Sequence, residues 1–260
     1  MKKWLLLLLL ISTGAHAALR EQQVDYQAGD TTLKGYLVWD DKITGKRPGV
    51  LVVHEFWGLN DYARTRARML AELGYTALAV DMYGEGKVGA HPREASEFMN
   101  AVLANADVAK ARFVAAKEFL EKQPTVAPNK LAAIGYCFGG GTVLAMARAG
   151  VDLKAVASFH GLLNTKTPAQ PGQVKAQILV ETGADDQMAP MTDVDNFKKE
   201  MTAAGVNYHV DVYPSAKHGF TNPDADAIAK QFELPVGYNA DADKKSWAAL
   251  QKLLKEVFAG

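Results

Sequence analysis

The sequence LAAIGYCFGGG at residues 131–141 constrains the fold more than any other stretch of the chain. Its first four residues are apolar, as in a short strand buried in a parallel sheet. The pattern Gly-Tyr-Cys-Phe-Gly follows, and residues 142–149 then have a helical pattern. A strand, a sharp turn and a helix around G-x-nucleophile-x-G are typical of the turn that lifts a nucleophile above the edge of a sheet. The stretch therefore predicts a nucleophile at Cys137.

Cys137 is the only cysteine among the 260 residues, so an internal disulfide is excluded. One interpretation is an unreactive cysteine, because free cysteines often pack as small buried apolar residues. The strand before it and the helix after it favour a nucleophile instead. Glycines two positions before and after Cys137 fit this setting, since they let strand and helix approach closely without a Cβ clash.

The N-terminus has the pattern of a secretory signal peptide. Two lysines precede an apolar run at residues 4–11, and an Ala-His-Ala cleavage site ends at Ala17. We expect residues 1–17 to be removed and the mature chain to start near Ala18. A membrane anchor is the alternative, but the apolar run is shorter than the ~20 residues that a span needs. The lysine-rich start is of a bacterial kind and indicates the periplasm.

Composition favours one globular domain over residues 18–260. The chain is 48% hydrophobic, and it contains neither a low-complexity segment nor an internal repeat. Its 29 basic and 29 acidic residues balance, which argues against nucleic acid or an acidic membrane surface as the main partner. The sequence favours a monomer without fixing the oligomeric state.

Short apolar runs alternate with amphipathic ones along the chain. This alternation predicts an α/β fold, with a mostly parallel sheet and helices on both faces. The first strand, at residues 31–39, is expected at an edge of the sheet. The expected strands are residues 31–39, 50–54, 75–80, 131–134, 155–159, 177–180 and 208–213, and the expected helices are residues 61–73, 92–103, 107–121, 142–149, 191–204 and 241–258.

Residues with reactive or polar side chains follow several of these strands. They are Glu55, Tyr83, Cys137, Asp186 and His218. Because ligands bind beyond the carboxyl ends of parallel strands, we expect these side chains to lie at one site. A thiol needs a base to become a thiolate, and a histidine base needs an acid to orient it.

The order Cys137, Asp186, His218 is the order of nucleophile, acid and histidine that hydrolases with this turn use. His218 lies in a loop after the last expected strand, where that order requires a histidine. His54 and His160 also follow strands and remain open candidates. Asp185 is adjacent to Asp186, and only one of the two can orient the histidine.

Four motifs in this order resemble the dienelactone hydrolase family of the α/β-hydrolase fold. They are GYCFGG around Cys137, HEFWGLN at residues 54–60, GADDQMAP at residues 183–190 and HGF at residues 218–220. The resemblance extends over residues 26–258. It implies a hydrolase for a small ester or lactone, of the carboxymethylenebutenolidase type, with a Cys-Asp-His triad. Within the acid motif, the spacing to Pro190 assigns the triad acid to Asp186.

The resemblance also implies roles for residues around the thiol. Glu55 would hold the resting thiol and take its proton. The backbone N–H groups of Phe138 and Phe56 would form the oxyanion hole, and the first of them sits at a helix N-terminus, which favours anions. Tyr83 and Trp57 are expected in the substrate pocket. The aromatic residues after Glu55 indicate a buried carboxyl with a raised pKa.

The chain departs from the family at two positions. Where the family's dienelactone enzymes have arginines for the substrate carboxylate, this sequence has Glu85 and Asn222. A buried substrate carboxylate needs such a cation. We therefore expect neutral esters or lactones as substrates.

Two other classes of function are weighed against a hydrolase. A binding protein with an inactive site would not need a complete set of nucleophile, acid and histidine. A thiol redox sensor often has a resolving cysteine, which this chain lacks. The sequence contains no H-E-x-x-H motif or cysteine cluster, so we expect no metal and no cofactor.

Overall fold

The computed structural model of the chain describes residues 18–259. The predicted signal peptide at residues 1–17 lies outside the described residues. Among the residues described, no helix combines the length and the hydropathy needed to cross a membrane.

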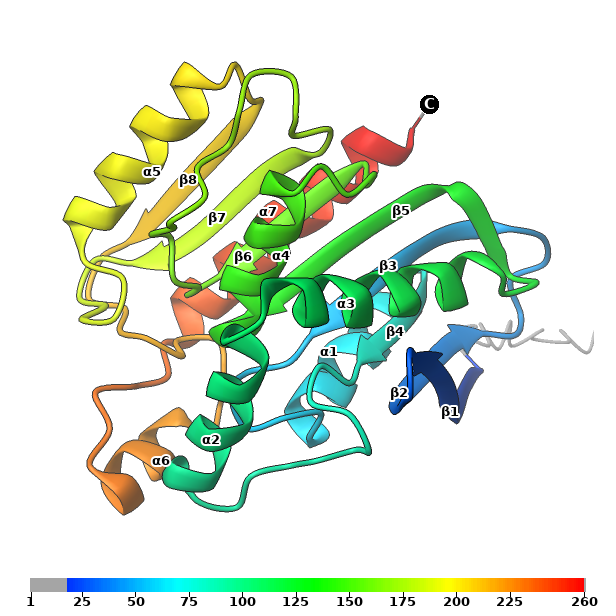
Figure 1. Cartoon of the computed structure of the whole chain (residues 1–260), viewed down its shortest axis with the longest axis horizontal. Helices are drawn as coiled ribbons and strands as arrows, with labels where there is room; N and C mark the ends of the chain where they lie inside the picture. The colour runs from blue at the N-terminus through cyan, green and yellow to red at the C-terminus, as the bar shows by residue number, and fades with distance from the viewer. Residues whose placement is uncertain (1–17, 260) are drawn as a thin grey trace, which may run out of the picture.

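An eight-stranded sheet forms the centre of the molecule, with the order β1-β2-β4-β3-β5-β6-β7-β8 (Figure 1). Strand β2 runs antiparallel to both of its neighbours, β1 and β4. The other six strands, β3 to β8, are parallel to one another. The α/β class and the mostly parallel sheet are therefore confirmed. The strands are β1 (Leu19–Ala28), β2 (Thr31–Asp40), β3 (Arg47–Val53), β4 (Thr76–Val80), β5 (Val126–Tyr136), β6 (Ala155–Phe159), β7 (Gln177–Gly183) and β8 (Tyr208–Tyr213).

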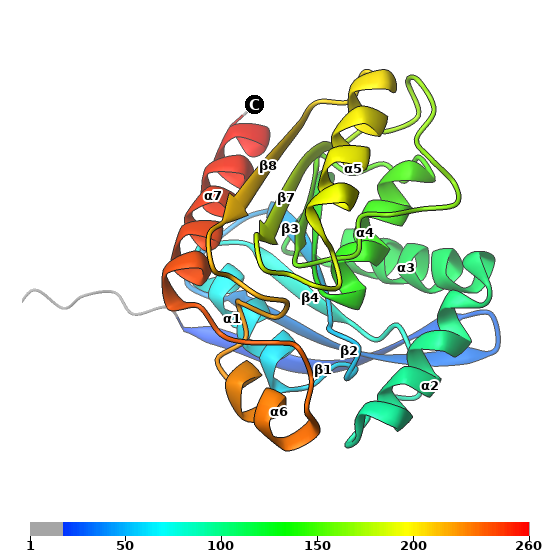
Figure 2. The same ribbon diagram turned by 90° about the vertical axis from the view of Figure 1, so that its left-hand side faces the viewer.

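Helices cover both faces of the sheet. Figure 2 shows α7 on one side of the sheet and α3, α4 and α5 on the other. Helix α1 packs with α7 in one apolar cluster, whereas the other three helices share a second cluster. The helices are α1 (Asp61–Glu72), α2 (Pro92–Leu103), α3 (Ala106–Glu121), α4 (Phe138–Arg148), α5 (Met191–Ala203), α6 (Ala225–Phe232) and α7 (Ala240–Phe258).

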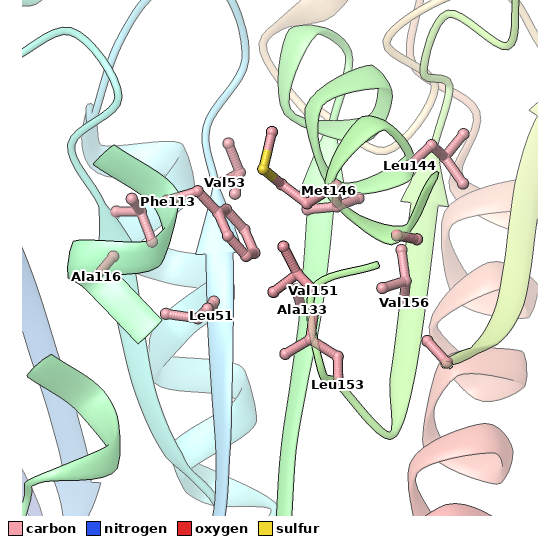
Figure 3. Close-up of a cluster of buried hydrophobic side chains, with 14 of the residues drawn as sticks. Leu51, Val53, Phe113, Ala116, Ala133, Leu144, Met146, Val151, Leu153 and Val156 are labelled. Carbon is pink, nitrogen blue, oxygen red and sulfur yellow. The ribbon is translucent and has the colours of Figure 1, made fainter. Parts of the chain in front are cut away.

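The two clusters follow from the alternation of side chains along each strand. In β3, Leu51 and Val53 face the cluster of α3 and α4, whereas Val50 and Val52 face that of α1 and α7. Figure 3 shows Val53 gathered with side chains from α3 and α4. Because both faces are covered, the central strands are mostly buried and largely apolar, as expected of a parallel sheet.

Two elements were not predicted, and one of them corrects the edge of the sheet. Residues 31–39 were expected at the edge, but β1 pairs with β2 along its whole length and takes that position. Only Val24 and Tyr26 of β1 are buried, so its sequence is mostly polar. Helix α6 has only 8 residues and begins soon after Pro223. Its sequence is therefore too short to show a clear helical period.

Helix α4 begins at Phe138, four residues earlier than predicted, because the glycine run is part of the helix. Cys137, just before it, has φ 53° and ψ −116°, a left-handed backbone that is rare for residues other than glycine. A Cβ atom on Gly135 would lie 2.1 Å from the carbonyl oxygen of Gly139, and one on Gly139 would lie 2.2 Å from that of Val53. The glycines are thus required where the helix start touches β3 and β5.

We predict that Gly139→Ala destabilises the protein, whereas Gly141→Ala does not. The added methyl group at position 139 overlaps the backbone of β3, and overpacking of this kind costs about 1–3 kcal/mol or more. At position 141 the nearest atom would be 3.4 Å away, so the same substitution should be neutral or stabilise the helix by up to about 1 kcal/mol. Urea unfolding of both variants measures the difference, and equal stability would contradict the close contact.

Candidate active site

The elbow before α4 fixes the backbone of Cys137. Its N–H donates to the carbonyl oxygen of Phe159 at 3.0 Å and to Nδ1 of His160 at 3.2 Å. Both acceptors lie at the end of β6, the strand beside β5. The thiol is half-buried and lines two cavities, one on either side of it.

Asp186 and His218 come together from the loops after β7 and β8. Nδ1 of His218 lies 2.9 Å from Oδ2 of Asp186, and both side chains are buried. The other oxygen of Asp186 accepts from the N–H groups of Met188 at 2.8 Å and Ala189 at 3.1 Å. The carboxylate is therefore held by three hydrogen bonds. Asp185 is exposed and does not make this contact.

The second ring nitrogen of His218 is the one that serves the cavity. Nε2 is buried and has no hydrogen-bond partner among residues 18–259. Burial of the ring opposes its charge, but the negative charges of Cys137 and Asp186 outweigh this and raise the pKa of His218 above its ordinary value. An imidazole held in this way beside the thiol of Cys137 can move a proton between Nε2 and a bound substrate.

Glu55 follows β3 and is buried at 6% exposure. Burial raises the pKa of its carboxyl to about 7, while the hydrogen bond from Asn222 and the charge of His218 act in the opposite direction. Nδ2 of Asn222 donates to Oε2 of Glu55 at 2.8 Å. Asn222, at one of the family's arginine positions, thus positions an acid of the site.

Tyr83 has a different place from the one expected. Its hydroxyl donates to the carbonyl oxygen of Phe56 at 2.7 Å, and its ring packs on Phe138 at 5.5 Å between centroids. Tyr83 does not line either cavity beside Cys137 in the described part of the chain. It holds the peptide group between Phe56 and Trp57, next to the one whose N–H was expected in the oxyanion hole.

A small cavity of about 20 Å³ lies on the histidine side of Cys137. Trp57, predicted in the pocket, lines this cavity and packs on Phe232 of α6 at 5.8 Å between ring centroids. Helix α6 and the residues after it contribute apolar side chains to the lining of this cavity. The polar and reactive residues that line it are Glu55, Cys137, His218 and Asn222.

Sequence analysis missed a buried chain of hydrogen bonds beneath the site. Because Nδ1 of His160 accepts from Cys137, Nε2 carries the proton and donates to Oγ1 of Thr221 at 2.7 Å. That hydroxyl in turn lies 2.6 Å from the hydroxyl of Tyr62, to which Arg66 donates. Burial lowers the pKa of His160 well below its ordinary value, so it stays neutral. These hydrogen bonds connect the elbow to the loop that carries His218.

His54 also has a structural place. Its Nε2 accepts from the N–H of Met82 at 3.3 Å, so Nδ1 donates to the carbonyl oxygen of Glu55. Burial lowers the pKa of His54 to about 4 and keeps the ring neutral. His54 therefore joins the ends of β3 and β4 beneath Glu55.

Glu85 lies away from both cavities beside Cys137. Its carboxylate accepts from the N–H of Thr32 at 3.1 Å in an exposed position. The carboxylate of Glu85 therefore binds a backbone N–H of β2, and its charge lies away from a substrate at the thiol. Within residues 18–259, no group of three or more histidine, cysteine or acidic side chains is arranged to hold a metal ion.

Comparison with known proteins identifies the family of the chain. The family model described as "Dienelactone hydrolase family" matches residues 33–258. A dienelactone hydrolase-like promiscuous phosphotriesterase from metagenomic libraries is 36% identical, with a TM-score of 0.85 over 92% of this chain and 99% of that one. A structure named m3DLH is 37% identical, with a TM-score of 0.87 over 93% and 99%.

Among curated sequences, a protein of Aquifex pyrophilus named usf is 30% identical over 207 residues, which is 77% of this chain and 87% of that protein. The family model covers most of the chain, and the two solved structures share the fold described above. The chain is therefore a hydrolase of the α/β-hydrolase fold, and it belongs to the dienelactone hydrolase family.

Proposed function

We propose that this hydrolase cleaves esters or lactones by nucleophilic catalysis at Cys137, with His218 and Asp186 completing a triad. One observation carries the proposal. Nδ1 of His218 is bound to the buried Asp186, and the opposite ring nitrogen lies buried on the cavity that Cys137 also lines. A histidine held in this way can transfer a proton at Nε2 alone.

The first half of the reaction forms a thioester. The proton of the thiol passes to Glu55 or His218, and the thiolate attacks the carbonyl carbon of the substrate. A bond forms between Sγ and that carbon while the carbonyl electrons move onto oxygen. When this intermediate collapses, the bond to the alcohol oxygen breaks, and His218 gives that oxygen a proton.

The negative oxygen of the intermediate needs donors that are already in place. The N–H of Phe138 is at the first position of α4, where no acceptor exists within the helix. The N–H of Phe56 is the second expected donor, and the carbonyl oxygen of the same peptide group, that of Glu55, accepts from Nδ1 of His54 and from the N–H of Gly58. Donors set in advance stabilise the charge as it develops, and loss of one typically slows turnover by roughly 10²–10³-fold.

The second half of the reaction needs water. The small cavity of about 20 Å³ beside Glu55, Cys137 and His218 has room for one water molecule. His218 takes a proton from the water as its oxygen attacks the thioester carbon, and the bond between carbon and Sγ breaks. The carboxylic acid leaves and the thiolate is restored.

Uncharged substrates fit this site better than carboxylates do. Asn222 already donates one amide N–H to Glu55, and no basic side chain among the described residues lines the small cavity apart from His218. A carboxylate there would lose its hydration without a guanidinium to replace it. Family membership favours turnover over the alternatives of an inactive binding protein or a redox sensor.

We predict that Cys137→Ala lowers kcat/KM for p-nitrophenyl acetate by roughly 10³-fold or more, because the nucleophile is lost. Acid-quenched wild-type reactions should carry an acetyl group on Cys137 in peptide mass maps. Thermal unfolding of the variant checks that it is folded. A folded, fully active Cys137→Ala variant, or an acyl group on a serine, would exclude the proposed nucleophile.

We predict that Asp186→Asn lowers kcat by ~10⁴-fold, as expected when the acid of a triad no longer orients its histidine. Asp185→Asn is the matched control, since its exposed side chain makes no contact with His218, and it should stay within about twofold of wild type. Steady-state kinetics with the same ester measures both. A larger loss in the Asp185 variant would show that the wrong carboxylate is assigned.

We predict that kcat/KM rises with pH through about 7. Because burial raises the pKa of Glu55, this carboxyl is protonated at lower pH and cannot take the thiol proton. Asn222→Leu removes a hydrogen bond that favours the ionised form. The midpoint of the pH profile should therefore move upward by about 1–2 units.

Asn207→Leu is the control for this profile, because Asn207 is exposed and precedes β8 at the opposite edge of the sheet. Its midpoint should equal that of wild type. An unchanged midpoint in the Asn222 variant, with activity retained, would show that Glu55 does not set the acid limb.

A further inference from the structure

A groove of about 790 Å³ opens on the side of Cys137 opposite the small cavity. It runs between the helices α2 and α3 on one side and α4 on the other. Cys137 and Phe138 lie at it, so it begins at the proposed reacting atom. Its apolar lining includes Met99, Val102, Leu103, Ala106, Ala145 and Leu162.

Two large apolar side chains of this lining are open to solvent. Leu103, at the end of α2, is 55% exposed, and Leu162, after β6, is 41% exposed. Exposed leucines that face one another across a groove mark a surface which an apolar ligand can cover. The hydrophobic effect therefore favours an apolar chain in this groove.

The charged groups of the groove do not call for an ionic ligand. Arg148 is engaged by Glu200, with Nε to Oε1 at 2.8 Å, and by the carbonyl oxygen of Leu163. The other charged residues that line it are one acid, Asp107, and one base, Lys110, both exposed. Their charges balance, so the groove is best matched by an uncharged chain.

The position of His218 decides which part of an ester would lie in the groove. His218 must protonate the leaving oxygen, so the alcohol part lies on the histidine side of Cys137. Among the described residues, His218 lines the small cavity but not the groove. The acyl part, attached to the carbonyl carbon that Sγ attacks, then points the other way.

We propose that the groove between α2, α3 and α4 binds the apolar acyl chain of the substrate, so that the preferred substrates are esters of medium-length or longer fatty acids. This inference rests on the proposed function and narrows its substrate class. A compact dienelactone would leave most of the groove unfilled. An acyl chain would cover Leu103 and Leu162 while its carbonyl carbon stays at Cys137.

The test compares p-nitrophenyl esters of acetate, butanoate and octanoate on the mature protein. Each methylene that leaves water contributes up to about fourfold, so kcat/KM should rise from acetate to octanoate by roughly 30-fold or more. A second series of alkyl acetates varies the alcohol instead, and it should show a smaller rise. A flat acyl series, or a rise confined to the alcohol series, would overturn the proposal.

A variant places the effect in the groove. Ala145 is an exposed residue of α4 that lines it, and Ala145→Phe narrows the groove without disturbing the core. The ratio of kcat/KM for octanoate to that for acetate should fall at least about tenfold. Ala203→Phe is the matched control, an exposed alanine on α5 outside the groove, and it should keep the wild-type ratio.

An unchanged ratio in Ala145→Phe would also overturn the proposal. Failure of the proposed function looks different. In that case the wild-type protein would hydrolyse acetate no faster than Cys137→Ala does. Hydrolysis of acetate that depends on Cys137, combined with a flat acyl series, would remove the groove proposal alone.

Discussion

The close contact between the start of α4 and the end of β3 is the constraint on which the site depends. Gly139 lies so near the carbonyl oxygen of Val53 that no side chain fits between them. This contact lets the chain turn at Cys137 with a positive φ, and it directs the N–H groups of the first turn of α4 toward the carboxyl edge of the sheet. One packing contact thus places both the proposed nucleophile and the N-terminus of a helix at the same edge of the sheet.

The polar groups around this elbow are buried, and each is stabilised by a specific partner. Asp186 accepts two backbone N–H groups and pairs with His218, and Glu55 accepts from Asn222. Leaving any of these groups unpaired in a low-dielectric interior would destabilise the fold. The same burial raises the pKa of Glu55 to about 7, where a carboxyl group can exchange protons near neutrality.

Cys137 separates two environments of different character. On one side the small cavity is lined by Glu55 and His218 and has room for water, and on the other the larger groove is mainly apolar. Proton transfer needs fixed polar groups, whereas binding of a chain needs apolar surface that can be removed from water. Helix α6 lines the small cavity, and the loop after β6 lines the groove. Neither element has a clear pattern in the sequence.

The sequence by itself determined the alternation of strands and helices, the elbow at Cys137, and the order in which Cys137, Asp186 and His218 follow their strands. These are local patterns, set by side-chain periodicity and by glycines at fixed spacing. Only the tertiary structure decided that β1 covers the edge, that Tyr83 braces Phe56, and that Asn222 holds Glu55. Asn222 and Glu55 are 167 residues apart in the chain, and such contacts depend on how loops from different strands meet at one edge of the sheet.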